Sequence, residues 1–138
     1  MNWLHWALLS ALFAGLTAVL AKAGVKDIDS HLATALRTVV IFIFVWCIAL
    51  IRGFEPLTKV TSRAWLFLAL SGLATGASWL CYFRALQLGE ASKVAPVDKL
   101  SVVIAMILAV LFLGEHSNWR QWIGAGFIVT GSIIIARV

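Results

Sequence analysis

The chain has 138 residues, of which 62% are hydrophobic and only 12% are charged. A soluble domain of this length would need far more polar surface, so the composition excludes one and indicates an integral membrane protein. The formal net charge is +5, but the basic residues are scattered between apolar segments, which argues against nucleic-acid binding and suits contact with anionic lipid headgroups.

Five apolar segments, each long enough to cross a bilayer as a helix, follow one another along the chain. They are expected at residues 3–23, 30–51, 64–86, 93–113 and 118–136. Only short polar connections join them, so the sequence predicts one all-α transmembrane domain over residues 1–138 with five transmembrane helices. The first segment lacks a basic region before it and is long, so we expect it to stay in the membrane rather than act as a cleaved signal.

Small residues recur at helical spacing in the first and third segments. They are Ser10, Ala14 and Ala18 in the first and Gly72 and Gly76 in the third. Such faces let a second helix backbone approach closely, so they are expected to pack against other helices.

The second segment begins after Asp29 and Ser30, either of which can cap its first amides. Arg37 follows about two turns inside the segment, where its guanidinium could bind a carboxylate or phosphate by bidentate contact. It could equally extend to the lipid headgroups, and the pattern leaves both interpretations open.

Trp79, Tyr82 and Arg84 lie near the end of the third segment. Trp79 and Tyr82 are three residues apart on one helical face and could stack on an organic substrate or a cation, or anchor the helix at the membrane interface. Arg84 could join Arg37 and Lys99 in an electropositive vestibule, although extension to the headgroups is the interpretation that its position favours.

Asp98 and Lys99 lie side by side inside the otherwise apolar fourth segment. Counted from Lys93, Asp98 lies ~7–8 Å along the helix, where unpaired charge is costly, so the pair predicts a functional site. Asp98 could bind a proton or cation while Lys99 binds an anionic group of the substrate. The alternative is a structural ion pair with Arg37, Arg84 or an opposite subunit.

No nucleophile–base arrangement, phosphate-cradling loop or metal-ligand spacing appears in the sequence, so we expect neither an enzyme nor a bound metal or cofactor. Cys47 and Cys81 lie inside apolar segments and are expected to be buried as small hydrophobic side chains.

Lys and Arg are almost balanced between the two membrane faces that five alternating spans imply. One face, which we call the Trp-rich face, carries the segment ends with Trp3, Trp6, Trp46, Trp65, Trp119 and Trp122. This face has Arg52, Lys59, Arg63 and Arg120, and the opposite face has Lys22, Lys26, Arg84, Lys93 and Arg137. A membrane protein is oriented by an excess of Lys and Arg on one face. Four of these residues on one face against five on the other is almost no excess, so we expect the chain to insert in both orientations and to form an antiparallel pair of copies. If Arg84 and Lys93 are largely buried, a modest bias instead places the Trp-rich face inside.

Short motifs along the chain carry a resemblance to a known family. They are Ala18–Lys22, Ala35–Arg37, Gly76–Leu86, Ala95–Val97, Leu111–Glu115, Trp122–Ala125 and Val129–Gly131. Together they resemble the EamA-type domain of the drug/metabolite transporter superfamily. Most members carry two such domains, ten spans in all, and move small organic solutes. This chain looks like the short five-span branch, which implies a second half from another copy and the cytoplasmic membrane of a prokaryote. The Asp98–Lys99 pair lies outside the general family pattern.

The sequence and this resemblance together predict a secondary transporter that works by alternating access as an antiparallel homodimer. Its partners would be a small organic solute, for which an anionic group is one option, and membrane lipids. The candidate substrate contacts are Asp98, Lys99, Arg37, Arg84, Trp79 and Tyr82. The alternatives are a subunit of a lipid-linked carrier flippase and a membrane scaffold that transports nothing.

Overall fold

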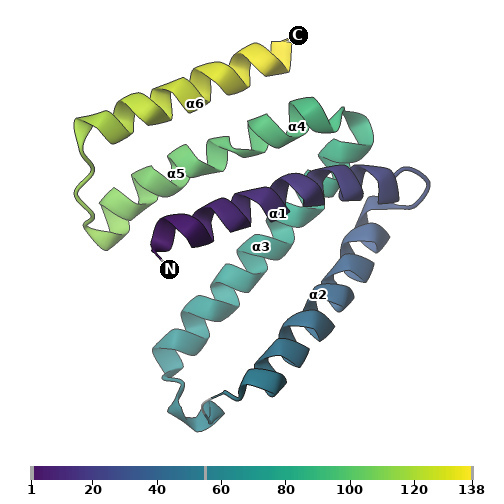
Figure 1. Ribbon diagram of the computed structural model, residues 1–138, viewed down its shortest axis with the longest axis vertical. Helices are drawn as coiled ribbons and strands as arrows, with labels where there is room; N and C mark the ends of the chain where they lie inside the picture. The colour runs from purple at the N-terminus through teal and green to yellow at the C-terminus, as the bar shows by residue number, and fades with distance from the viewer. Residues whose placement is uncertain (1, 55, 138) are drawn as a thin grey trace. The chain divides into compact units, whose positions relative to one another are not determined.

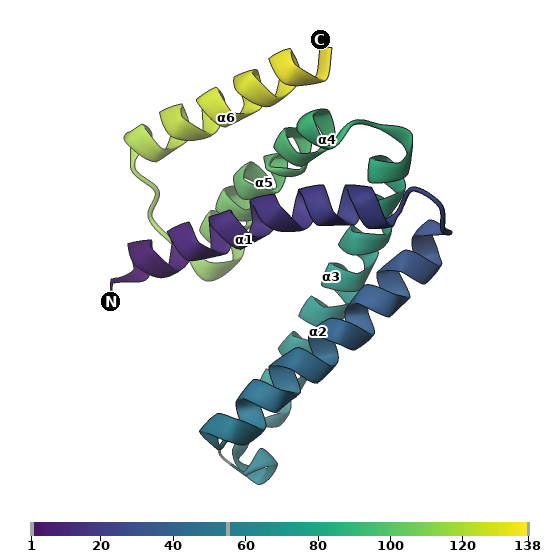
Figure 2. The same ribbon diagram turned by 45° about the vertical axis from the view of Figure 1, so that its right-hand side comes forward.

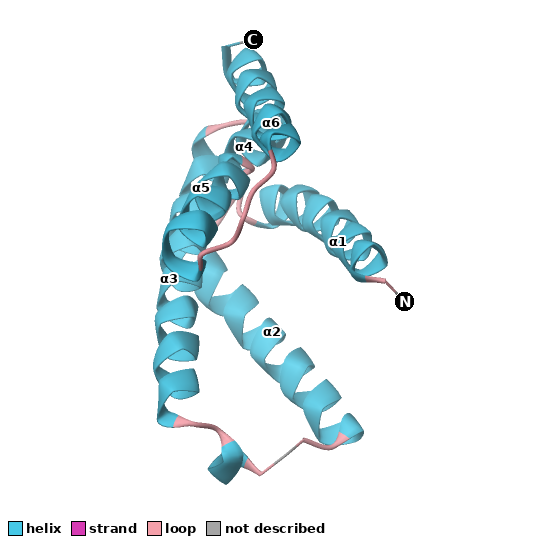
Figure 3. Ribbon diagram, turned by 90° about the vertical axis from the view of Figure 1, so that its left-hand side faces the viewer, coloured by secondary structure: helices cyan, strands magenta, loops and turns pink. Residues whose placement is uncertain are grey.

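The computed structural model describes residues 2–54 and 56–137, and within these ranges the chain is helical without strands (Figure 3). Its α-helices are α1 (Trp3–Gly24), α2 (Ser30–Arg52), α3 (Ser62–Leu88), α4 (Ala91–Asp98), α5 (Leu100–Leu108) and α6 (Trp119–Arg137). A 3-10 turn, η1 (Leu57–Lys59), precedes α3, and a π-helical segment, η2 (Ala109–Leu113), continues α5. The all-helical prediction is confirmed.

Among the described residues, four helical stretches are long and apolar enough to cross a membrane. They are Trp3–Gly24, Ser30–Arg52, Ser62–Leu88 and Ala91–Leu113. The helix α6 is not among them, because its 19 residues include Arg120 and Gln121 in the first turn and Thr130 and Ser132 further along. The role of α6 as a fifth span therefore stays a prediction.

The chain divides into two compact units, which we describe separately. The α2–α3 unit is Ala23–Gln87, and the α4–α6 unit is Met1–Lys22 with Leu88–Val138. In the first unit, α2 and α3 run in opposite directions and are joined through η1 (Figure 2). In the second, α6 runs back along both α4 and α5 and packs against them (Figure 1).

Most apolar side chains of this single chain are exposed, and the buried ones are few. Val25 and Leu86, which belong to the α2–α3 unit, are almost fully covered, whereas Cys47 and Cys81 are exposed. The expectation of two buried cysteines is therefore wrong, because both lie on outward helix faces that a lipid or a partner helix would cover. Apart from the backbone of α3 itself, no atom lies within 4 Å of a Cβ added at Gly72 or Gly76, so no other helix packs closely against these two positions.

The fourth predicted segment is not one regular helix. The helix α4 ends at Asp98 and α5 begins at Leu100, and Lys99 between them has φ −69° and ψ −8°. Pro96 has no N–H to donate to the preceding turn. The Lys99 N–H donates to the Pro96 carbonyl at 3.1 Å, a spacing of three residues that is tighter than in an α-helix. The interruption, residues 98–100, thus falls at the charged pair.

The end of η2 explains the glycine of the Leu113–Gly114–Glu115 motif. Gly114 has φ +68°, in the left-handed region that glycine adopts without a steric penalty. The Glu115 N–H donates to the Ala109 carbonyl at 3.3 Å, which closes the helix end before the connection to α6.

Candidate functional site

The charged pair in the fourth segment lies at the interruption and is only partly covered. The Lys99 Nζ donates to the Asp98 Oδ2 at 3.4 Å, and their side chains are 54% and 35% exposed. Asp98 therefore pairs with its own neighbour within the described residues, and no described ion pair links it to Arg37 or Arg84. A long contact between two accessible groups leaves both free to exchange partners with a ligand or an ion.

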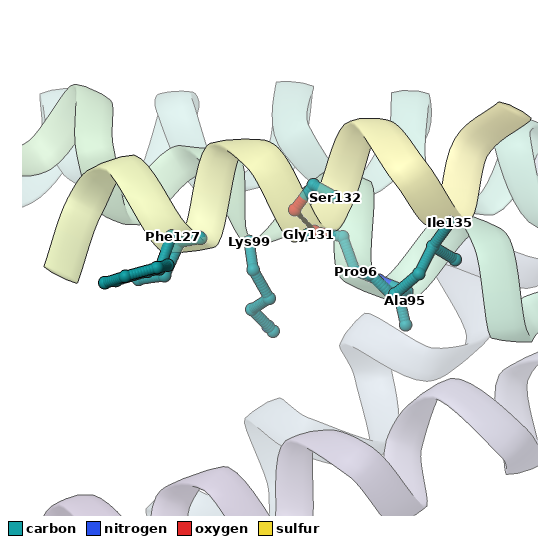
Figure 4. Close-up of a pocket in the computed structure, with 8 residues that line it drawn as sticks. Ala95, Pro96, Lys99, Phe127, Gly131, Ser132 and Ile135 are labelled. Carbon is teal, nitrogen blue, oxygen red and sulfur yellow. Dashed lines mark hydrogen bonds between the residues drawn. The ribbon is translucent and has the colours of Figure 1, made fainter.

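A shallow, open groove of about 440 Å³ lies along α4 and α6 beside this pair. Its lining residues are Ala95, Pro96, Lys99, Phe127, Ile128, Gly131, Ser132 and Ile135. In Figure 4 the Lys99 side chain projects into the space flanked by Phe127 and Pro96. The walls are apolar apart from Lys99 and Ser132, so the groove suits an organic molecule with an apolar body and one polar or anionic group.

Ser132 ties the two walls of the groove together. Its Oγ donates to the Pro96 carbonyl at 2.9 Å, and the residue is only 5% exposed (Figure 4). The sequence analysis missed this residue. The sequence offered only a weak signal, because Ser132 is one of two hydroxyl side chains, with Thr130, in the otherwise apolar part of α6.

In the α2–α3 unit, Arg37 of α2 lies across aromatic rings of α3. The Arg37 Cζ lies 4.3 Å from the Trp79 ring centroid and 5.5 Å from that of Phe83. Tyr82 also interacts electrostatically with Arg37. Three predicted site residues, Arg37, Trp79 and Tyr82, therefore lie together, and the guanidinium occupies the Trp79 face on which stacking of an organic substrate was expected.

Phe83 completes this cluster and was missed by the sequence analysis. It is 3% exposed and four residues after Trp79, so the two rings lie on one face of α3. We call Arg37, Trp79 and Phe83 the Arg37 stack.

Arg84 lies at the end of the α2–α3 unit where α1 passes into α2. Its Nη1 donates to the Gln87 Oε1 at 3.0 Å, and the Gln87 Nε2 donates to the Ile28 carbonyl at 2.7 Å. Arg84 is exposed and makes no described contact with Arg37. Asp98 and Lys99 belong to the other unit. The electropositive vestibule of Arg37, Arg84 and Lys99 therefore stays a prediction.

Asp29, one of the two residues that the sequence left open as a cap, is the one that caps α2. Its Oδ1 accepts from the His31 N–H at 2.9 Å and the Leu32 N–H at 3.2 Å. The Leu32 hydrogen bond, helped by that of His31, holds the pKa of the Asp29 carboxyl below its ordinary 3.8. Among the described residues, no group of three or more His, Cys, Asp or Glu side chains could hold a metal ion.

Comparison with known proteins identifies related chains. A family described as the EamA-like transporter family matches residues 1–137. A Sinorhizobium sp. protein named as an uncharacterized transporter in the cobO 3′ region is 55% identical over 98% of this chain and 96% of its own length. The uncharacterized transporter sll1164 of Synechocystis is 25% identical, and the match spans 91% of this chain but 37% of that protein.

A third relative is a probable 4-amino-4-deoxy-L-arabinose-phosphoundecaprenol flippase subunit ArnE of Pseudomonas fluorescens. It is 30% identical over 60% of this chain and 70% of its own length. No solved structure matches this chain. The family match and the four apolar helices indicate a multi-pass membrane protein.

Proposed function

Because this chain belongs to the EamA-like transporter family, we propose that it is a secondary transporter that moves a small organic solute by alternating access. The observation that carries the proposal is the interruption of the Ala91–Leu113 span at Asp98 and Lys99. Broken helices and intramembrane charges are typical of transporter binding sites, because freed backbone groups and charged side chains replace the hydration of cargo and coupling ions.

In this proposal the groove between α4 and α6 receives the apolar body of the solute. Lys99 binds an anionic or polar group, since its side chain is half exposed and its described ion pair is one long contact. Asp98 binds the coupling proton or cation. Exchange of the Lys99–Asp98 contact for contacts to cargo and ion then couples the two binding events.

The working unit in this proposal is an antiparallel homodimer with ten helices in all. Each copy contributes one EamA-type domain over residues 1–138, with α6 as its fifth span. Support comes from the near balance of Lys and Arg, four against five, between the two faces. The length of the Synechocystis relative is also consistent with two such domains, because this chain matches 37% of it. The bacterial relatives support a location in the cytoplasmic membrane of a prokaryote.

The proposed transport is tested in two steps on the purified chain. A thermal-shift screen of metabolites first finds ligands, because a solute that binds the folded state raises its apparent stability. Uptake of each stabilising solute is then measured in proteoliposomes against empty liposomes. Transport predicts protein-dependent, saturable uptake of at least one solute, and stabilisers that are never taken up would contradict it.

The antiparallel arrangement has its own test. Cys47 and Cys81 are replaced by Ser, a cysteine is appended to the C-terminus, and intact cells are labelled with a maleimide that cannot cross membranes. Dual orientation predicts that part of the population is labelled from outside and the rest only after permeabilisation. A single orientation in every molecule would remove the antiparallel model.

A flippase subunit for a lipid-linked carrier is the second candidate, favoured by the similarity to the ArnE protein. Lys99 would then hold a phosphate while acyl chains stay in the bilayer. Co-purification of a polyprenyl phosphate, detected by mass spectrometry and lost in Lys99→Met, would favour this function over solute transport. A scaffold without transport predicts that Asp98→Asn with Lys99→Met leaves the cellular function intact.

A further inference from the structure

The Arg37 stack holds a cation inside an apolar helix without an acidic partner. Arg37 is the eighth residue of α2, so its Cα lies about 10 Å along the helix from Ser30. Within residues 2–54 and 56–137, no carboxylate forms an ion pair with it. A charged group inside a membrane costs free energy unless it has a partner, so we expect the Arg37 guanidinium to bind a group of opposite charge.

The stack also determines which part of the guanidinium remains available. The Arg37 Cζ lies over both rings, 4.3 Å from the Trp79 centroid and 5.5 Å from the Phe83 centroid. A guanidinium stacked in this way keeps its N–H donors in the plane of the group, along its edge. The side chain lies across α3 rather than along its own helix toward the headgroups, which favours ligand binding over the alternative left open by the sequence.

The neighbouring hydroxyl groups do not compete with the edge of Arg37 as donors to a ligand. The Thr34 Oγ1 donates to the Ser30 carbonyl and the Thr38 Oγ1 donates to the Thr34 carbonyl, both at 2.8 Å. Their hydrogens are therefore committed to the helix backbone. Charge recognition at this position depends on Arg37.

We propose that the edge of Arg37 binds an oxyanion, either a carboxylate or a phosphate, and that Trp79 and Phe83 are positioning residues that hold the guanidinium for it. Fork-shaped pairing with two oxygens matches carboxylate and phosphate geometry. It would follow that the transported solute is anionic, and this consequence rests on the proposed transport function. Oxyanion binding itself can be measured without any transport assay.

Arg63 provides a matched control within the same unit. Its Cζ lies 5.7 Å from the ring centroid of Phe67, which is four residues along the same helix. Arg63 therefore has a cation–π contact but neither a second ring nor a partner helix. If added anions act only through general electrostatics, Arg63 and Arg37 should respond equally. If Arg37 forms a specific binding site, only Arg37 should respond.

The test is a side-chain NMR titration of the full chain, labelled with ¹⁵N-arginine, in phosphatidylcholine nanodiscs. The Nε–H resonances of Arg37 and Arg63 are assigned by their loss in Arg37→Lys and Arg63→Lys. Benzoate, inorganic phosphate and chloride are added at equal ionic strength. In a second arm, part of the phosphatidylcholine is replaced by phosphatidylglycerol without added anion.

A saturable shift of the Arg37 resonance with benzoate or phosphate supports binding of a soluble oxyanion. A shift only with phosphatidylglycerol supports the phosphate of an anionic lipid headgroup as the source. Trp79→Leu should weaken the apparent affinity about tenfold, because the guanidinium loses the cation–π contact that positions it, and Trp79→Phe should restore it. A role of Trp79 in folding alone would not show this pattern in variants that remain equally stable.

Three results would overturn the inference: no saturable response in either arm, an equal response to chloride, or an equal response of Arg63. Each is independent of the transport proposal. Saturable uptake of a neutral or cationic solute with a silent Arg37 would contradict the oxyanion site alone. A responsive Arg37 with no uptake of any stabilising solute would contradict transport alone.

Discussion

The hydroxyl of Ser132 donates a hydrogen bond of 2.9 Å to the carbonyl oxygen of Pro96, which joins α6 to α4 just before the interruption at Lys99. The same carbonyl accepts the Lys99 N–H at 3.1 Å. One acceptor therefore connects the irregular turn, the charged pair and the opposite wall of the groove. Because of this contact, the groove lies beside Lys99, where the helix is interrupted, and not beside a regular stretch of helix.

Removal of the Ser132 hydroxyl should loosen this connection. Ser132→Ala is expected to lower the free energy of unfolding by about 1 kcal/mol, since a buried hydrogen bond is lost. Hydrogen exchange at Lys99 and Leu100 should become faster in the same variant. Thermal denaturation in detergent and exchange measured by mass spectrometry check both effects.

Thr130→Ala is the control for Ser132→Ala. The Thr130 Oγ1 donates to the Gly126 carbonyl at 2.9 Å within α6 itself, and the residue is exposed. Its replacement should leave exchange at the interruption unchanged. Equal acceleration in both variants would mean that the Ser132 hydrogen bond does not support the α4–α6 contact.

The contact between Arg37 and Trp79 should appear as a coupling energy. Arg37→Met, Trp79→Leu and the double variant form a cycle, and we expect a coupling of about 1 kcal/mol, the usual size of a partly covered cation–π contact. Urea or thermal unfolding in detergent supplies the free energies. The Arg63–Phe67 cycle should give a smaller value because the ring lies further away, at 5.7 Å, and additive variants at Arg37 and Trp79 would contradict the stack.

Asp29 should make the start of α2 sensitive to acid. Its lowered pKa means that the ionised carboxylate stabilises the cap fully above the ordinary pKa of 3.8, and that this contribution is lost as the pH falls through the lower folded value. Amide shifts and exchange of His31 and Leu32, followed from pH 6 down to about 2, should report that loss.

Asp29→Asn separates the charge from the cap. Asparagine can accept the same backbone hydrogen bonds, so the variant should retain the helix start and lose its pH dependence. Asp29→Ala should weaken the cap at every pH. An unchanged acid response in Asp29→Asn would assign the transition to another group.

Local signals were sufficient to predict the helices. Continuous apolar runs and the Asp29 cap depend on residues close in the chain, so α1, α2 and α3 begin and end near the expected positions. The left-handed Gly114 is likewise a local feature. Whether α6 spans the membrane is harder to predict, because the polar residues of its first turn and its small residues lower the mean hydropathy of the helix.

Contacts between helices were not predictable in the same way. The interruption depends on Pro96 meeting Ser132, which lies 36 residues further along the chain. Arg37 was identified as a candidate from its position about two turns inside the second segment, and Trp79 from its aromatic side chain. Nothing in the sequence near either residue indicates that one side chain stacks on the other. Phe83 was overlooked because a buried phenylalanine in an apolar helix has no distinguishing pattern until its partner is known.

The most direct test of the central claim is uptake of a stabilising solute into proteoliposomes that contain Asp98→Asn with Lys99→Met. Glu90→Gln with Lys93→Met is the matched control, since that pair lies 3.9 Å apart at the start of α4, outside the interruption. The account predicts a loss of about tenfold or more in the first variant and the native rate in the second. Native uptake without the charges of Asp98 and Lys99, in protein that inserts normally, would contradict a transport site at the interruption.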